Sequence, residues 1–121
     1  MIYQKDYIMR EIESLLHVIT DIYLEKEETE YIPTGKEEDY QIDRLYQQLE
    51  DLWNQKKINE AENLLFEKIE ISNRDYLKIA VNLYRKMNRL SDEELEKYQF
   101  SREEISQGLK EVMDLFGIVI L

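Results

Sequence analysis

Residues 42–69 read IDRLYQQLEDLWNQKKINEAENLLFEKI, and this stretch decides the fold class. Apolar side chains recur every three or four positions, first over residues 42–53 and again over residues 61–69. These steps place them on one face of an α-helix, because the helix has 3.6 residues per turn. Since only a few residues separate the two runs, the helices must lie antiparallel, and the stretch predicts an αα-hairpin.

Helix starts are marked in three places by Ser or Asn with Glu three positions later, the pattern of a capping box. The pairs are Asn59 with Glu62, Ser91 with Glu94, and Ser101 with Glu104. We therefore expect a second hairpin, with one helix over about 73–88 and further helices after residues 91 and 101. Gly117 should end the last helix in the left-handed conformation. Gly108 lies inside that helix, where a closely packed neighbour is one reason for a missing side chain.

The N-terminal part of the chain predicts one long helix followed by the main loop. Apolar residues recur at helical spacing from Tyr7 to Tyr23, with Ile22 among them, and Asp6 is the predicted N-cap. Residues 31–35, YIPTG, hold the only proline and predict a loop. We expect a single domain over residues 1–121, with an N-terminal helix in 1–30, a loop over 31–37 and helical hairpins over 38–121.

The expected fold is all-α, with five to six helices, and its long N-terminal helix packs on two consecutive αα-hairpins. The side chains expected in the core where the hairpins meet are Leu49, Leu52, Trp53, Leu64, Leu65, Leu83 and Met87. Segments 56–62 and 88–94 also align with each other, with an apolar residue, a cap and two acids in common. Two interpretations stay open: both segments are simply helix starts, or the hairpins stack as in a repeat protein.

Residues 59–65, NEAENLL, resemble the second helix of a tetratricopeptide repeat. In that repeat a small residue packs against the preceding helix and a large residue follows four positions later, as Ala61 and Leu65 do here. The chain departs from the pattern because Lys56 stands where Gly usually ends the first helix, and the closing Pro is absent. The resemblance implies a tetratricopeptide-like packing of the first hairpin.

Two other segments resemble an uncharacterised family of short bacterial all-helical proteins, a domain of unknown function. They are residues 5–13, KDYIMREIE, and residues 90–95, LSDEEL. This resemblance implies a helical fold and supplies no catalytic residue.

The composition limits the partners and the location of the protein. Lys and Arg total 16 and Asp and Glu total 27, so the net charge is −11 and the protein repels nucleic acid and anionic lipid. Cysteine is absent, which excludes disulfides and thiolate chemistry. No apolar run is long enough to span a membrane, and the start lacks the pattern of a signal peptide. We expect a cytoplasmic protein that binds neither nucleic acid nor membrane.

Basic residues gather in a single segment of this acidic chain. Arg74, Lys78, Arg85 and Arg89 follow one another at helical spacing, so they form a stripe on one helix face. We expect carboxylates of neighbouring helices or of a partner to face this basic stripe. Anion or nucleic-acid binding through Arg74 to Arg89 is retained as a third hypothesis.

His17 is the only histidine, and Glu13 and Asp21 lie one helical turn before and after it. These three side chains could bind a divalent metal or a small ligand, although the Glu-x-x-His spacing of di-metal bundles is absent. The sequence has no Gly-rich phosphate loop and no Gly-x-Ser-x-Gly motif. We therefore expect no enzymatic activity, cofactor or metal, and retain ligand or metal binding at these three residues as the alternative function.

The printed sequence ends in four aliphatic residues, Ile118, Val119, Ile120 and Leu121. Left in water they would form a sticky patch, so we expect them to pack on the N-terminal helix or to enter a second subunit. Together with the basic stripe they form the predicted interaction surface. The predicted function is a non-enzymatic protein–protein interaction or self-associating module, whose partner is another protein or a second copy in a homodimer.

Overall fold

The computed structural model describes the backbone of residues 2–24 and 30–119, and the side chains of 6–24 and 30–119. Within these residues the chain forms six α-helices and one short 3-10 helix, with no strand, which confirms the expected all-α class. The elements are α1 (Ile2–Tyr23), η1 (Glu37–Asp39), α2 (Tyr40–Asn54), α3 (Ile58–Lys68), α4 (Asp75–Asn88), α5 (Asp92–Lys97) and α6 (Arg102–Leu115). None of the described helices is long and apolar enough to cross a membrane.

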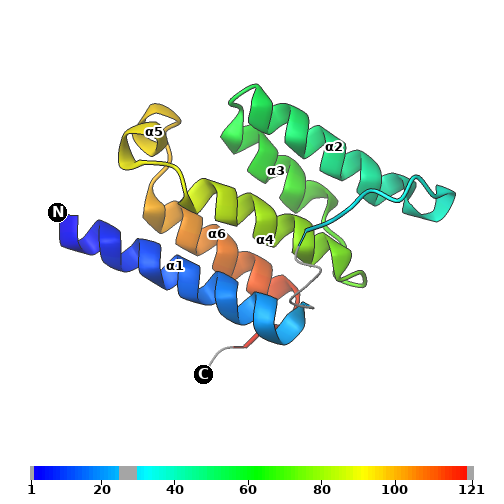
Figure 1. Cartoon of the computed structure of the whole chain (residues 1–121), viewed down its shortest axis with the longest axis horizontal. Helices are drawn as coiled ribbons and strands as arrows, with labels where there is room; N and C mark the ends of the chain where they lie inside the picture. The colour runs from blue at the N-terminus through cyan, green and yellow to red at the C-terminus, as the bar shows by residue number, and fades with distance from the viewer. Residues whose placement is uncertain (1, 25–29, 120–121) are drawn as a thin grey trace.

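Helix α4 lies in the middle of the molecule and packs against α1, α6 and α2. Figure 1 shows α1, α6 and α4 side by side, with the α2–α3 hairpin beyond α4. The N-terminal helix therefore packs on α4 and α6, and the two expected hairpins are α2 with α3 and α4 with α6. The short α5 lies in the connection of the second hairpin.

The central position of α4 follows from its sequence. Its buried residues are Tyr76, Leu77, Ile79, Ala80, Val81, Leu83, Tyr84, Met87 and Asn88. They form a band wider than a single apolar stripe, because Ile79 and Val81 lie on its two flanks, and a helix with such a wide apolar surface needs neighbours on several sides. Of the seven expected core residues, Leu49, Leu65, Leu83 and Met87 are buried, whereas Leu52, Trp53 and Leu64 are half-buried.

The predicted loop at residues 31–35 folds over the first turns of α2. The Tyr31 hydroxyl donates a hydrogen bond to the Asp43 carboxylate, which also accepts the backbone N–H groups of Thr34 at 3.2 Å and Gly35 at 2.9 Å. Gly35 has a φ of 73°, which suits glycine. These bonds hold the pKa of Asp43 below its ordinary value, with the Tyr31 hydroxyl as the largest cause.

Two of the three predicted capping boxes are borne out at least in part. At α5 the Ser91 hydroxyl accepts the Glu94 N–H at 3.1 Å, and the Glu94 carboxylate accepts the Ser91 N–H at 3.1 Å. At α6 the Ser101 hydroxyl accepts the Glu104 N–H at 3.1 Å, but its own proton goes to the Glu104 carboxylate, so the box is only half formed.

The third capping box, at Asn59, is wrong. Helix α3 begins at Ile58 with Lys57 as N-cap, and the Ala61 N–H already donates to the Lys57 carbonyl at 3.0 Å. Asn59 therefore lies inside the helix, and its amide donates to the Tyr98 carbonyl at 3.2 Å. Since Ser91 does cap α5, the aligned segments 56–62 and 88–94 share no common start geometry.

Two expectations for α1 are also wrong. The helix begins at Ile2, so Asp6 lies within it and is not its N-cap. The periodicity also predicts Tyr7 and Ile22 on the apolar face, but both are exposed. The chain leaves the helix at Leu24, whose N–H donates to the Ile19 carbonyl at 3.2 Å, and Leu24 is buried instead.

Three helices end in the same Schellman motif, one of them with the glycine that the motif favours. Gly117 has a φ of 68°, and the Ile118 N–H donates to the Met113 carbonyl at 2.8 Å, as predicted for the end of α6. The same left-handed position after α2 and α5 is held by Lys56, with a φ of 64°, and Gln99, with a φ of 60°. A side chain in this conformation costs stability that glycine avoids.

We expect Gln99→Gly to stabilise the protein by roughly 0.5–1 kcal/mol, because the relief of left-handed strain exceeds the added freedom of the unfolded chain. Urea unfolding followed by circular dichroism measures the change. Gln107→Gly, the same substitution at an exposed position in the middle of α6, is the control and should destabilise by roughly 0.5–1 kcal/mol. Equal losses in both variants would contradict the motif's role.

Candidate functional site

A groove of about 220 Å³ lies between α1 and α4 and joins the two sets of residues that the sequence singled out. From α1 it is lined by Glu13, Leu16, His17 and Thr20, and from α4 by Arg85, Asn88 and Arg89. These segments are far apart in the sequence and meet because α1 packs against α4. The α1–α4 groove is the first candidate site.

The two arginines of this groove lie four residues apart, Arg85 in the last turn of α4 and Arg89 directly after its end. The Arg85 guanidinium is half-buried and donates to the Thr20 hydroxyl at 3.3 Å, whereas Arg89 is exposed. Burial and then the charge of Arg89 lower the pKa of Arg85, and Glu30 acts in the opposite direction. Within the described part of the chain neither arginine forms an ion pair.

The three residues of the alternative site, Glu13, His17 and Asp21, do not converge at one point. Each of the two carboxylates is associated with His17 separately. Glu13 and His17 both line the α1–α4 groove, and His17 Nε2 lies 3.0 Å from the Asp21 carboxylate. Among the described side chains no three acids or histidines converge as metal ligands. His17 therefore lines the groove and contacts one carboxylate, and it does not belong to a set of metal ligands among the described side chains.

The basic stripe divides into two halves. Arg74 donates to the Tyr23 carbonyl at 3.1 Å, and its guanidinium lies 5.8 Å from the centre of the Tyr23 ring. Lys78 lies 3.4 Å from the Asp75 carboxylate. Of the four residues of the basic stripe, Arg85 and Arg89 line the α1–α4 groove, whereas Arg74 and Lys78 do not.

The wall of the α1–α4 groove is fixed by a buried arginine that the sequence did not reveal. The Asn88 amide donates to the Met9 carbonyl at 3.2 Å, and its side-chain oxygen accepts from Arg102 at 3.1 Å. Because both ends of the Asn88 side chain are held, the α4 side of the groove has a defined shape.

A second and larger groove, of about 670 Å³, lies between α2, the end of α3 and the start of α4. Its lining residues are Gln41, Arg44, Leu45, Gln48, Glu67, Lys68, Ile69, Glu70 and Tyr76. Leu45 and Tyr76 are buried and make its floor, and exposed Tyr40 accepts a hydrogen bond from Arg44 at 2.9 Å beside it. Sequence patterns do not predict this α2–α4 groove, because its lining depends on where α3 ends.

A buried polar contact joins α3, α4 and α6. The Tyr84 hydroxyl donates to the Glu62 carboxylate, and both groups lie against Gly108. A methyl group at Gly108 would overlap the Tyr84 hydroxyl and the Glu62 carboxylate, so the close neighbour expected there is confirmed. Glu62 therefore serves this contact instead of the predicted capping box.

Burial raises the pKa of Glu62 above its ordinary value of 4.5, and this effect exceeds the opposite one of the Tyr84 hydrogen bond. The charges of Glu111 and Glu104 add to the increase. A carboxyl whose folded pKa is raised stabilises the fold while it is protonated, and this stability is lost as the pH rises through the folded pKa.

We expect Glu62→Gln to gain stability relative to wild type as the pH is raised from about 4.5 to neutrality. Glutamine keeps an oxygen that accepts from Tyr84 but never carries the buried charge. Urea unfolding at several pH values measures the difference. Glu103→Gln, at an exposed position on α6, controls for the loss of one charge, and an equal pH dependence of both variants would contradict the prediction.

The two described residues of the C-terminal aliphatic segment, Ile118 and Val119, differ in their exposure. Ile118 is buried, which agrees with packing inside the chain, whereas Val119 is 71% exposed. Ile120 and Leu121 lie outside the described residues.

The fold and the two grooves described above belong to a small helical protein. Residues 2–117 match the model of a family of unknown function, DUF6483, and the chain belongs to this family. The predicted membership of an uncharacterised family is confirmed to this extent. Comparison with curated proteins gave no significant match, and neither did comparison with solved structures.

Proposed function

We propose that the protein is a non-enzymatic interaction module that binds a segment of a partner protein in the α2–α4 groove. The observation that supports this proposal is the groove itself, whose volume of about 670 Å³ lies in the usual range of ligand sites. Its apolar floor and polar rim match the usual anatomy of a protein interface.

The chemistry of the rim favours a peptide segment as the occupant. Arg44 and Lys68 supply positive charge, Glu67 and Glu70 supply negative charge, and two glutamine amides can pair with a partner's backbone. Tyrosine and arginine are also the residues that most often dominate binding at interfaces. The expected segment places an apolar side chain over Tyr76 and carries charges of both signs on either side.

Two exposed residues with large apolar side chains adjoin lining residues of the α2–α4 groove, because Tyr40 bonds to Arg44 and Ile71 follows Glu70 in the chain. Tyr40 is 57% exposed and Ile71 is 61% exposed, one at the start of α2 and the other after α3. A partner segment that covers them buries apolar area beyond the floor. A second copy of the chain is the alternative occupant, as expected for a homodimer. The acidic, cysteine-free composition supports a cytoplasmic location.

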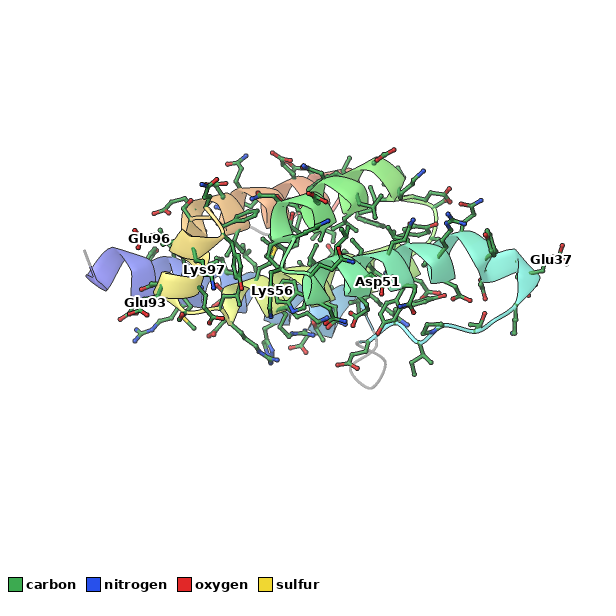
Figure 2. The ribbon with its side chains drawn as sticks, turned by 90° about the horizontal axis from the view of Figure 1, so that it is seen from above. Glu37, Asp51, Lys56, Glu93, Glu96 and Lys97 are labelled. Atoms are coloured by element: carbon green, nitrogen blue, oxygen red, sulfur yellow. The ribbon has the colours of Figure 1, made fainter. Side chains whose placement is uncertain are left out.

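Site-specific photo-crosslinking in the native cell tests the proposal. A photoreactive amino acid at Gln48 should give one dominant crosslinked protein, whereas the same group at Lys97 should not. Figure 2 shows Lys97 with Glu93 and Glu96 on α5, at the opposite end from Glu37, which precedes α2. Light scattering of the purified protein separates a second copy from another partner.

Charge reversal in the rim supplies the matched comparison. Arg44→Glu and Lys68→Glu should each reduce the crosslinked product at Gln48 several-fold, and Lys97→Glu should leave it unchanged. These side chains are exposed, so folding should be affected little. Equal crosslinking in all three variants would refute binding in this groove.

A further inference from the structure

The α1–α4 groove gathers positive charge on a strongly acidic protein. Arg85 and Arg89 lie four residues apart at the end of α4, where like charges repel. Burial of part of Arg85 increases the cost of this arrangement, because among the described side chains its guanidinium donates its hydrogen bond to the neutral hydroxyl of Thr20 and not to a carboxylate. A bound anion between the two arginines would remove the repulsion.

We infer that the α1–α4 groove is a binding site for a small oxyanion of the phosphate class, held by the guanidinium groups of Arg85 and Arg89. Guanidinium groups form paired, charge-assisted hydrogen bonds with such anions. The Thr20 hydroxyl on the α1 side of the groove can donate to the anion while it accepts from Arg85. This site is separate from the α2–α4 groove and does not depend on the proposed function.

The size of the groove favours a small ligand. Its volume of about 220 Å³ lies below the 300–1,000 Å³ that is typical of sites for larger ligands. The buried side chain of Leu16 closes one part of the wall and Asn88 another, and Arg102 holds Asn88 in place. A phosphate-sized group fits these dimensions.

The carboxylates around the α1–α4 groove limit the kinds of anion that it can bind. Glu13 lines the α1 side, Asp21 pairs with His17, and Glu30 acts on Arg85 from a distance. These carboxylates repel an anion and limit the site to ligands that engage both arginines at once. An extended polyanion is disfavoured, because Arg74 and Lys78 are engaged elsewhere and the protein has a net charge of −11.

Titration of the full chain with inorganic phosphate, and separately with sulfate, tests the inference at constant ionic strength. Calorimetry should show one saturable site, and the NMR signals of Thr20, Arg85 and Arg89 should shift together. Arg89→Gln should weaken binding at least tenfold, on the order expected for a charge-assisted hydrogen bond. Arg44→Gln, in the other groove, should leave it unchanged.

A substitution of opposite sign sharpens the test. Glu13→Gln removes a repelling charge from the groove and should tighten phosphate binding several-fold. Arg85→Gln should abolish saturable phosphate binding. Arg85 is half-buried, so if this variant does not fold, the result for Arg89→Gln, at an exposed position, tests the inference.

Several results of the phosphate titrations would overturn the inference. They are shifts that do not saturate, an equal loss of binding in Arg44→Gln and Arg89→Gln, and weaker binding in Glu13→Gln. Binding of a single-stranded oligonucleotide through all four stripe residues, with a steep salt dependence and no phosphate binding, would also overturn it.

Discussion

Arg102→Met should destabilise the protein by roughly 3–5 kcal/mol, because it leaves several carbonyl acceptors without their charged donor, at about 1–3 kcal/mol each. Arg102 is only 6% exposed. Its guanidinium donates to the carbonyls of Asn88 and Leu90, both at 2.7 Å, and to the Asp92 carboxylate at 3.3 Å. Methionine fills a similar volume but leaves these acceptors without their donor.

The reason for so large an effect is the position of the acceptors. Asn88 is the last residue of α4, Leu90 lies in the link to α5, and Asp92 begins α5. The end of one helix and the start of the next are thus held by one side chain from α6. Arg102→Lys should recover only part of the loss, because an ammonium group cannot reach all three acceptors in the geometry of a guanidinium fork.

Lys110→Met is the matched control for Arg102→Met. Lys110 stands on the same helix and pairs with Glu11 on α1 at 2.9 Å, but its side chain is 52% exposed. Exposed pairs of this kind contribute about 0–1 kcal/mol. Urea unfolding of the three variants gives the comparison, and a loss for Arg102→Met no larger than for Lys110→Met would show that the network is dispensable.

Local signals in the sequence predicted the local features of this fold. The short link at Lys56 predicted the first hairpin, Ser91 and Ser101 predicted the starts of α5 and α6, and Gly117 predicted the end of α6. Each of these features depends on residues within one or two helical turns. The sequence carries such information directly, because backbone groups at helix ends need partners close by.

Features that depend on contacts between distant helices could not be predicted in the same way. Asn59 and Glu62 carry the pattern of a capping box, yet Glu62 pairs with Tyr84 on another helix, and nothing nearby in the sequence indicates this choice. Arg102 looks like one more charge in an acidic segment, because its acceptors lie in other elements. Local patterns reveal spacing, whereas tertiary packing decides which of several partners a side chain meets.

The candidate sites show the same division. Spacing placed Glu13 beside His17, and Arg85 beside Arg89, correctly within each helix. That the two pairs share one groove follows only from the packing of α1 on α4. The sequence does not predict the α2–α4 groove, because the end of α3 at Lys68 determines its shape and no sequence pattern marks that end.

Gly108→Ala should destabilise the protein by about 1–3 kcal/mol, the usual cost of overpacking a core. Helix propensity alone predicts the opposite, a gain of about 1 kcal/mol, because Gly108 lies inside α6. The sign reverses because the new methyl group would overlap the Tyr84 hydroxyl and the Glu62 carboxylate. These two groups hold each other by a hydrogen bond and resist displacement.

A double-mutant cycle identifies the cause of this loss. When Gly108→Ala is made in a chain that also carries Tyr84→Phe and Glu62→Ala, the two colliding polar groups are gone, so the substitution should cost at least about 1 kcal/mol less. Gln107→Ala, at the exposed neighbouring position, shows what propensity alone contributes and should change stability by a few tenths of a kcal/mol. An unchanged cost of Gly108→Ala in the altered background would place the strain in the helix backbone. The close approach of α6 to Tyr84 and Glu62 would then not be what requires glycine at this position.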